Sequence, residues 1–207
     1  MIQTKNISII GYSGHSYVCI DTALSMGHNI YGYFDIEEKR SNPYGLSYLG
    51  SEKNESVINN SGAMMFIGIG RNPLREKISQ IAHISNKLAI LIHDTAYVSS
   101  VANIEKGVLV AAGAVVHPMA SVSEGVICNT SCVVEHGCNI GAYSHIAPGA
   151  VLAGDVTVGK RVFIGANSTI KEGIKIVDDV IIGAGSVVLQ DISEPGTYVG
   201  VPVRRVG

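Results

Sequence analysis

The sequence predicts two fold classes in one chain: an α/β Rossmann-like N-terminal domain, then an all-β left-handed parallel β-helix. Apolar residues recur at every sixth position from Ile92 to Val188. Over the first 86 residues, short apolar segments instead alternate with helical ones. The composition is aliphatic, with 46% hydrophobic residues, 15% charged residues, 24 Gly and no Trp. We therefore expect one domain over residues 1–86 and another over 87–207, the second ending in a short tail.

The six-residue period carries the prediction for the second domain. Neither a helix nor an alternating strand has this period, but a short strand followed by a tight turn does. All 17 step positions are apolar and 16 are aliphatic: Ile92, Val98, Ile104, Val110, Val116, Val122, Cys128, Val134, Ile140, Ile146, Leu152, Val158, Ile164, Ile170, Ile176, Ile182 and Val188. The fourth residue after each step gives a second inward row of mostly small or β-branched side chains. Three six-residue faces per coil make a triangular prism of about 5.7 coils, the hexapeptide-repeat architecture.

Turn residues mark the corners of this prism. Glycine and asparagine tolerate the positive φ that tight turns require. We expect such turns at Gly113, Asn139, Gly141, Gly159, Asn167 and Gly185.

The first domain reads as a small parallel sheet with crossover helices. We expect strands at Ile7–Ile10, Asn29–Phe34, Ala63–Ile69 and Leu88–Ile92, and helices at Ser16–Met26 and Leu74–His83. Gly27 ends the first helix, and Pro73 suits the first turn of the second. The polar stretch Glu37–Asn60 is expected to be a loop.

Composition excludes several classes of function. A net charge of −2 and a pI of about 6.4 argue against a general nucleic-acid binder. No apolar window approaches the roughly 18 residues of a membrane span, and the N-terminus does not read as a signal peptide. The cysteines are Cys19, Cys128, Cys132 and Cys138, and they lack the spacing of a zinc site. We expect free thiols in a cytoplasmic protein, with those of the prism filling its core.

The first strand–helix turn is a candidate phosphate site. Gly11-Tyr12-Ser13-Gly14-His15 lies where a Rossmann-like unit binds phosphates with free amides and the helix dipole. Asp35 ends the second strand, where a carboxylate can bind a ribose. Gly70 follows the third strand at the same edge. The turn lacks the G-x-G-x-x-G fingerprint, and a purely structural turn is the alternative.

Four histidines lie on the prism, at positions 93, 117, 136 and 145. Val134 and Cys138 point inward by register, so His136 lies near the outer surface. An exposed imidazole, with an ordinary pKa near neutrality, can act as a general base. An ordinary surface histidine is the alternative.

Motifs in both domains resemble one enzyme family. Six segments of the chain resemble bacterial nucleotide-sugar N-acetyltransferases. They are the opening turn, residues 129–136, 140–141, 144–150 and 153–154, and the closing Gly200-Val201-Pro202-Val203-Arg204-Arg205. These enzymes act on 4-amino-4,6-dideoxy sugars of the bacillosamine, viosamine and perosamine type. The resemblance covers essentially the whole chain, in the same order and with compatible spacing.

The resemblance implies a homotrimer with active sites between neighbouring prisms. Acetyl-CoA would lie along the prism, and a nucleotide sugar, with UDP the first choice over dTDP or GDP, would reach over from the N-terminal domain. His136 matches the catalytic base, and His145 matches a residue that contacts acetyl-CoA near the thioester. Ala166 and Ala184 match positions that offer backbone groups to the pantetheine arm. Residues matching the nucleotide-sugar site are Ser13, Gly14, His15, Asp35 and Gly70.

Two positions depart from the family pattern. An acidic residue usually follows the base directly, whereas here Gly137 does. Either the dyad is missing, another carboxylate substitutes, or His136 works alone. Glu135 is a doubtful substitute, since neighbouring side chains on an extended chain diverge. The second departure is Ile36, where the family often has a second acid after Asp35.

The implied chemistry is direct attack of a sugar amine on the thioester, with His136 taking the proton and no metal involved. Arg204 and Arg205 can meet a CoA phosphate or form a solvated tail. Three rival hypotheses remain. They are O-acetylation of a sialic-acid-like sugar, a non-catalytic sugar-nucleotide-binding trimer, and a zinc lyase of the γ-carbonic-anhydrase type. The zinc site would use His117, His136 and His145, whose spacings of 19 and 9 do not fit 18-residue coils.

Overall fold

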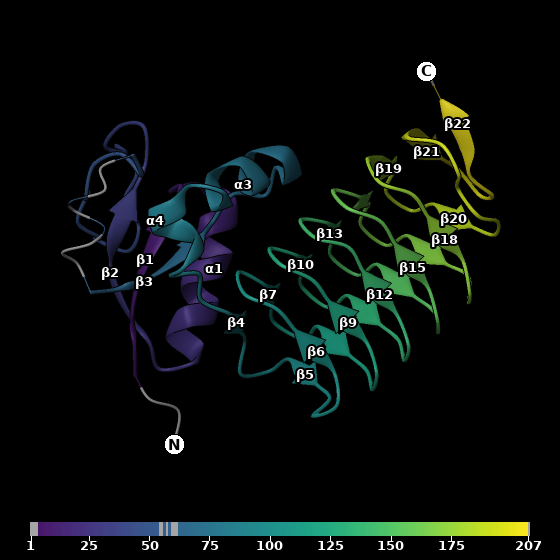
Figure 1. Ribbon diagram of the computed structural model, residues 1–207, viewed down its shortest axis with the longest axis horizontal. Coiled ribbons are helices and arrows are strands. Elements are labelled where there is room, and N and C mark those ends of the chain that lie inside the picture. Colours follow the sequence, from purple (N-terminus) through teal and green to yellow (C-terminus); the bar gives the residue numbers. More distant parts are fainter. Residues whose placement is uncertain (1–3, 54–55, 57, 59–61, 207) are drawn as a thin grey trace.

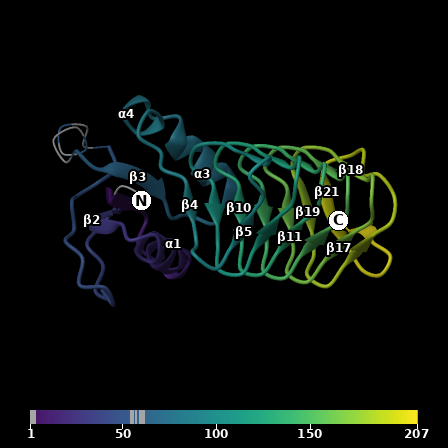
Figure 2. The same ribbon diagram turned by 90° about the horizontal axis from the view of Figure 1, so that it is seen from below.

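The computed structural model describes residues 4–53, 56, 58 and 62–206. The α/β part lies at one end of the long axis, and the β prism extends from it to the C-terminus (Figure 1). Figure 2 shows the coils stacked along this axis, with α1 and α3 next to the N-terminal coils. Within the described residues, no helix is long and apolar enough to cross a bilayer.

The N-terminal sheet has three parallel strands in the order β2-β1-β3. They are β1 (Asn6–Ile10), β2 (Asn29–Phe34) and β3 (Met64–Ile67), which confirms the three predicted strands. Because all three run in the same direction, their carboxyl ends meet at one edge. In the predicted loop after β2, Tyr48 forms a parallel bridge with Tyr33 of β2, and residues 54, 55, 57, 59 and 60 of the loop lie outside the described part.

The helices are α1 (Gly14–Ser25), α3 (Asn72–Ser79) and α4 (Ala82–Ser85). The single helix predicted over Leu74–His83 is wrong, because Ile81 is extended and separates α3 from α4. The Ile81 amide donates to the Ile78 carbonyl and closes α3 with a tight turn. This turn lets Ile78 and Ile84 reach the same buried cluster under β3.

The predicted strand Leu88–Ile92 serves two sheets. Leu88 bridges Met65 of β3, while β4 (Leu91–Ile92) pairs with β7 of the prism. This segment therefore joins the two parts through continuous backbone pairing.

Two-residue strands at six-residue intervals build the prism, which confirms the predicted repeat. After β4 come β5 (Tyr97–Val98), β6 (Asn103–Ile104), β7 (Leu109–Val110), β8 (Val115–Val116), β9 (Ser121–Val122), β10 (Ile127–Cys128), β11 (Val133–Val134), β12 (Asn139–Ile140), β13 (His145–Ile146), β14 (Val151–Leu152), β15 (Thr157–Val158), β16 (Phe163–Ile164), β17 (Thr169–Ile170), β18 (Lys175–Ile176), β19 (Val180–Ile182) and β20 (Val187–Val188). β21 (Gly196–Val199) and the antiparallel β22 (Arg204–Val206) close the C-terminal end.

The strands form three faces. The eight-stranded face has the order β22-β21-β19-β16-β13-β10-β7-β4, the six-stranded face β20-β17-β14-β11-β8-β5, and the five-stranded face β18-β15-β12-β9-β6. From β4 to β20, each strand pairs in parallel with the strand 18 residues away, as Ile127 does with His145 and Leu109.

The two predicted inward rows fill the prism, from Val108 to Ile192, with buried aliphatic side chains. The three prism cysteines are buried and free, as predicted for core fillers. Serines in the rows are satisfied by neighbouring coils, and Ser144 donates to the Gly159 carbonyl at 2.8 Å. The first coil is only partly buried, since it lies at the end of the stack.

The corner prediction is partly wrong. Gly113, Asn167 and Gly185 have positive φ as expected. Gly141 and Gly159 do not, and Asn139 lies in β12 instead of a corner. Gly141 is instead required by close approach, because a Cβ there would lie 2.5 Å from the Gly159 carbonyl carbon.

Candidate active site

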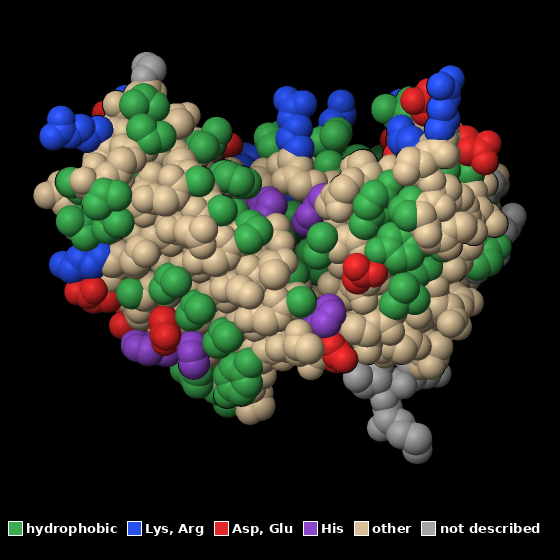
Figure 3. Space-filling model, turned by 180° about the vertical axis from the view of Figure 1, so that it is seen from behind, with side chains coloured by type: hydrophobic (Ala, Val, Ile, Leu, Met, Phe, Trp, Pro, Cys, Tyr) green, Lys and Arg blue, Asp and Glu red, His purple; other side chains and the backbone are tan. Residues whose placement is uncertain are grey.

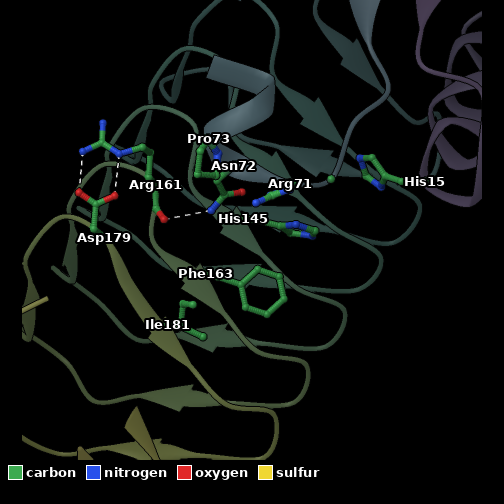
Figure 4. A pocket seen from close by; sticks show the side chains of 10 residues that line it. His15, Arg71, Asn72, Pro73, His145, Arg161, Phe163, Asp179 and Ile181 are labelled. Carbon is green, nitrogen blue, oxygen red and sulfur yellow. Dashed lines mark hydrogen bonds and ion pairs between the residues drawn. The ribbon is translucent and has the colours of Figure 1, made fainter. Parts of the chain in front are cut away.

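A hollow of about 570 Å³ lies where α3 and the strand-end turns meet the eight-stranded face. Its floor is a row of outward side chains from successive coils: His145 of β13, Phe163 of β16 and Ile181 of β19 (Figure 4). Its other lining residues are His15, Gly70, Arg71, Asn72, Pro73, Arg161 and Asp179. In Figure 3, histidine side chains gather at the hollow between the two parts, and others lie far from it along the lower edge of the prism.

The hollow brings together two histidines that were predicted to bind different substrates. The rings of His15 and His145 have centroids 5.8 Å apart, and the edge of one ring meets the face of the other in the His145–Phe163 pair at 5.1 Å. Gly70 approaches His15 closely enough that a Cβ on Gly70 would touch the imidazole at 3.7 Å. His15, Gly70 and His145 thus form one group.

Both imidazoles are held neutral. Burial, with the Arg75 charge, lowers the pKa of His15 to about 4. Burial also lowers the pKa of His145 to about 3, and the charges of Arg75 and His15 add to the effect. The Gly70 backbone lies near His145 but outside hydrogen-bond geometry, and it raises the pKa of His145 by less than burial lowers it.

The proton of His145 can be assigned to one nitrogen. The Thr130 amide donates to Asn129 Oδ1 at 2.8 Å, which turns the Asn129 amino group toward His145 Nε2 at 3.0 Å. The ring nitrogen Nε2 is therefore the acceptor, and Nδ1 carries the proton. Nδ1 of His145 and Nε2 of His15 are buried and have no hydrogen-bond partner within the described part of the chain. A ligand that reached either atom would satisfy a buried polar group that now lacks a partner.

A buried arginine fastens the two parts together. Arg75 of α3 is 2% exposed and makes no ion pair with a carboxylate of the described residues. Its guanidinium donates instead to oxygens of both parts, which belong to Ile69, Gly70, Asn72, Gly125, Tyr143 and Ser144. The side chain therefore carries an uncompensated charge beside the hollow. No sequence motif pointed to this residue.

A second missed feature borders the hollow. Arg161 forms a two-bond ion pair with Asp179 at 2.7 Å and reaches Glu76 of α3 at 3.3 Å. The Arg161 hydrogen bond lowers the pKa of Asp179. The two residues are 18 positions apart with opposite charges, so the coil period itself was the signal that could have found the pair.

The opening turn lines a separate, neighbouring hollow of about 340 Å³ that includes Ser13 and Asp35. Asp35 accepts from the Tyr12 amide at 2.9 Å and pairs with Lys39 at 3.1 Å. Ser13 is the N-cap of α1, and its amide donates to Ser16 Oγ at 2.7 Å. Gly14 starts α1 and is not among the described residues that line either hollow. The predicted nucleotide-sugar residues thus occupy two adjacent places along one sheet edge.

The predicted base lies away from both hollows. His136 is exposed at the corner between β11 and β12, which joins the six- and five-stranded faces. Since a triangular prism has each corner opposite one face, this corner is opposite the face that carries His145. Within one chain, His136 and His145 do not meet.

Ala166 and Ala184 lie at a third place. They are one coil apart at the corner between the eight- and six-stranded faces. The Ala166 carbonyl accepts from the Gly185 amide at 2.8 Å, which ties these coils together. Arg204 and Arg205 of the closing motif are both exposed, and Arg205 pairs with Glu194 at 2.5 Å.

The zinc hypothesis finds no support within one chain. His117 pairs with Glu135 at 3.6 Å, while His145 is buried on another face. In the described part of the chain, no three His, Cys, Asp or Glu side chains form a group that could hold a metal ion.

Comparisons with known proteins agree with this architecture. Residues 6–82 match the PglD N-terminal domain model, and residues 155–190 match the hexapeptide repeat of succinyl-transferase. A mutant perosamine N-acetyltransferase from Caulobacter crescentus, crystallised with CoA and GDP-perosamine, is 31% identical over 100% of this chain and 98% of its own, with a TM-score of 0.92. The acetyltransferase domain of PglB from Neisseria gonorrhoeae, in complex with acetyl coenzyme A, is 27% identical over 99% of this chain and 100% of its own, with a TM-score of 0.88.

An α/β unit fused to a hexapeptide-repeat prism, with histidines at their junction, defines a hexapeptide acyltransferase with an added N-terminal α/β unit. The match to the Caulobacter perosamine N-acetyltransferase, at 31% identity over 100% of this chain, identifies the family within this class. The chain belongs to the nucleotide-sugar N-acetyltransferase family, and the predicted resemblance is confirmed.

Proposed function

We propose that this enzyme transfers the acetyl group of acetyl-CoA to the 4-amino group of a nucleotide-linked 4-amino-4,6-dideoxy sugar. The observation that carries the proposal is the match of both parts of the chain to one enzyme crystallised with CoA and GDP-perosamine. In this proposal, residues 1–86 bind the nucleotide sugar and residues 87–207 bind acetyl-CoA. UDP is the nucleotide expected from the sequence, while the Caulobacter relative was crystallised with a GDP-linked sugar.

His136 is the proposed general base. The amine nitrogen forms a bond to the thioester carbonyl carbon, His136 takes a proton from that nitrogen, and the carbon–sulfur bond then breaks. The departing CoA sulfur receives the proton, so the imidazole returns to its neutral form. Exposure at a corner leaves His136 open to a substrate held by another surface.

The junction hollow is the proposed place for the groups that flank the reacting atoms. The protonated Nδ1 of His145 is a buried donor without a protein partner, which suits an oxygen of acetyl-CoA near the thioester. His15 offers an unpartnered Nε2 from the opposite wall to the nucleotide sugar. Placing both substrates in one hollow would supply much of the rate through proximity.

We infer a homotrimer, because one chain keeps His136 and His145 on opposite sides of the prism. Rotational symmetry can place the corner of one copy against the junction of the next. Free, buried cysteines support a reducing compartment, and we propose a cytoplasmic location on that ground.

The first experiment measures CoA release from acetyl-CoA with a panel of UDP-, dTDP- and GDP-linked 4-amino-4,6-dideoxy sugars. We expect turnover with one of them and a loss of about 10²–10⁴-fold in kcat for His136→Ala. His117→Ala is the matched control, since it removes another histidine from the same corner and should keep its turnover. Full turnover in His136→Ala would refute the base, whereas silence across the panel would favour O-acetylation or a binding role.

A mixing experiment tests whether the site is shared between copies. His136→Ala and His145→Ala are each expected to be nearly inactive. After joint unfolding and refolding, random assembly should give about a quarter of the sites both native histidines if these come from different copies. No recovery would show that both histidines act within one copy.

A further inference from the structure

A carboxylate from the next coil fills the space beside Gly137, the residue that follows the proposed base. Gly137 has a left-handed φ of 69°. A Cβ built on Gly137 would lie 2.1 Å from Asp155 Oδ1 and 3.2 Å from its Cγ. The Asp155 carboxylate therefore occupies the space in which a side chain at position 137 would begin.

The base itself rests on the residue before Asp155. A Cβ on Gly154 would lie 2.6 Å from Cε1 and 2.7 Å from Nε2 of His136. The Asp155 amide also donates to the His136 carbonyl at 2.9 Å. His136-Gly137 and Gly154-Asp155 thus stack as two dipeptides, in which each side chain lies over the glycine of the other.

The other charged groups around this corner are already engaged or neutral. Glu135, the neighbour of His136, faces His117 instead, with its Oε1 3.6 Å from Nε2 of that ring. One coil beyond Gly154, Lys171 and Glu172 pair with each other at 3.7 Å. Burial raises the pKa of the Cys138 thiol to about 11, so this thiol is neutral at pH 7. Asp155 is an exposed carboxylate that makes no ion pair with any described residue.

We propose that Asp155 is the positioning residue that replaces the missing acid at Gly137. Its carboxylate stabilises the imidazolium that forms when the base takes the proton of the amine, and so favours ring positions close to Asp155. No ion pair joins the two side chains in the described structure, so the effect acts through space or through one bridging water. This inference rests on the proposed role of His136.

Corner packing alone could place the side chain there. At another corner, Asn167 folds over Gly149 in the same way, with Oδ1 2.3 Å from the position of a Cβ. Asn167 shows that this geometry needs no charge, and it also has positive φ, at 55°. Asp155→Asn should therefore keep the backbone geometry of the corner and remove only the negative charge. The proposal assigns the effect on His136 to that charge.

The direct test is an NMR titration of the His136 imidazole in the ligand-free, full-length protein. Removing a nearby negative charge destabilises the imidazolium, so Asp155→Asn should lower the protonation midpoint of His136 by about 0.5–1 pH unit. Glu135→Gln is the control and should leave that midpoint unchanged. In turnover assays, the acidic limb of the kcat/KM profile should shift with the midpoint, kcat should fall about 3–10-fold, and the KM for acetyl-CoA should stay the same.

A charge swap completes the test. Gly137→Asp alone places its Cβ against Asp155, whereas Gly137→Asp combined with Asp155→Gly moves the carboxylate back by one coil without a collision. The double variant should recover the midpoint and kcat that Asp155→Asn loses. An unchanged His136 midpoint in Asp155→Asn would overturn the inference, even if the enzyme is active. Absence of turnover in the unmodified enzyme would instead refute the proposed function, because the titration needs no substrate.

Discussion

The α/β part and the prism are both built on parallel strands, but their strands pair over different distances along the chain. In the prism, from β4 to β20, strands pair with those 18 residues away, as Val133 does with Val115 and Val151. In the α/β part, β1 pairs with β2 and with the distant β3, across connections of unequal length. A fixed period lets each coil be built from contacts with its two neighbours, whereas the α/β sheet depends on connections of unequal length.

The junction follows neither rule. There, Arg75 of α3 reaches the carbonyls of Gly125 and Tyr143 in two successive coils. Asn72 donates to the Val162 carbonyl at 3.0 Å, and Ser79 donates to Tyr143 Oη at 2.7 Å. Polar side chains on one short helix thus bind backbone carbonyls and one tyrosine hydroxyl of the prism, and the hollow with the two neutral histidines forms beside them.

The largest effect is expected from breaking this junction. Arg75→Met removes a buried cation whose partners would be left unsatisfied, and we expect it to lower the free energy of unfolding by about 3–5 kcal/mol. The α/β part should unfold separately from the prism, because the coils keep their own contacts. Calorimetry with far-UV circular dichroism at 222 nm measures this.

Arg71→Met is the control for that experiment, since Arg71 is an exposed arginine at the N-cap of the same helix. It should change the stability by less than about 0.5 kcal/mol. A single, unshifted transition in Arg75→Met would show that the junction is not held by this side chain.

The difference between the periodic prism and the α/β part explains how much of the fold could be predicted from the sequence. The prism interior could be read position by position, because a period of six states which side chains point inward. The break at Ile81 could not be read, since a helical pattern continues across it and the turn is fixed by a tertiary cluster. The role of Arg75 was also hidden, because an arginine on a polar helix reads as solvent-facing until its partners 50 or more residues away are known.

The candidate site divides in the same way. Exposure of His136 followed from the register, and the strand-end positions of Ser13, His15 and Asp35 followed from the order of elements. The meeting of His15 of α1 with His145 of β13 depends on how the α/β part packs against the prism, which no local pattern encodes. The contact between Gly137 and Asp155 was within reach, because the residues are 18 positions apart, but the direction of the Asp155 side chain was not.

A second, smaller effect concerns the pH dependence of stability. The native pKa values of His15 and His145, about 4 and about 3, lie below the roughly 6.5 of an unfolded histidine. Below pH 6.5 the unfolded chain therefore binds more protons than the native state. The stability that comes from keeping these histidines neutral is full above that pH and is lost as the pH falls toward 4. Between about pH 6.5 and 4, each histidine should lower the free energy of unfolding by about 1.4 kcal/mol per pH unit.

Urea unfolding at pH 7, 6 and 5 measures this loss, and His145→Gln isolates one of the two histidines. The variant should lose stability less steeply than the unmodified protein, by about 1.4 kcal/mol per pH unit. Equal slopes in both proteins would mean that His145 is solvated and that the two parts do not enclose it.

The smallest effect on stability, and the sharpest test of the comparison, comes from glycine. In the prism, Gly141 is fixed by the approach of another coil, and in the opening turn Gly11 is fixed by a φ of 84° and by Ile69, 2.8 Å from a Cβ. Gly14 has neither constraint, because a Cβ there meets nothing within 4 Å. Gly14→Ala should therefore raise the stability by about 0.5–1 kcal/mol, whereas Gly11→Ala should lower it by about 1–3 kcal/mol.

If Gly14 serves the nucleotide sugar by close approach of its backbone, Gly14→Ala should raise the KM for that substrate about 3–10-fold and leave the KM for acetyl-CoA unchanged. An unchanged KM for both substrates would remove Gly14 from the site and leave it as a helix-starting residue that alanine can replace.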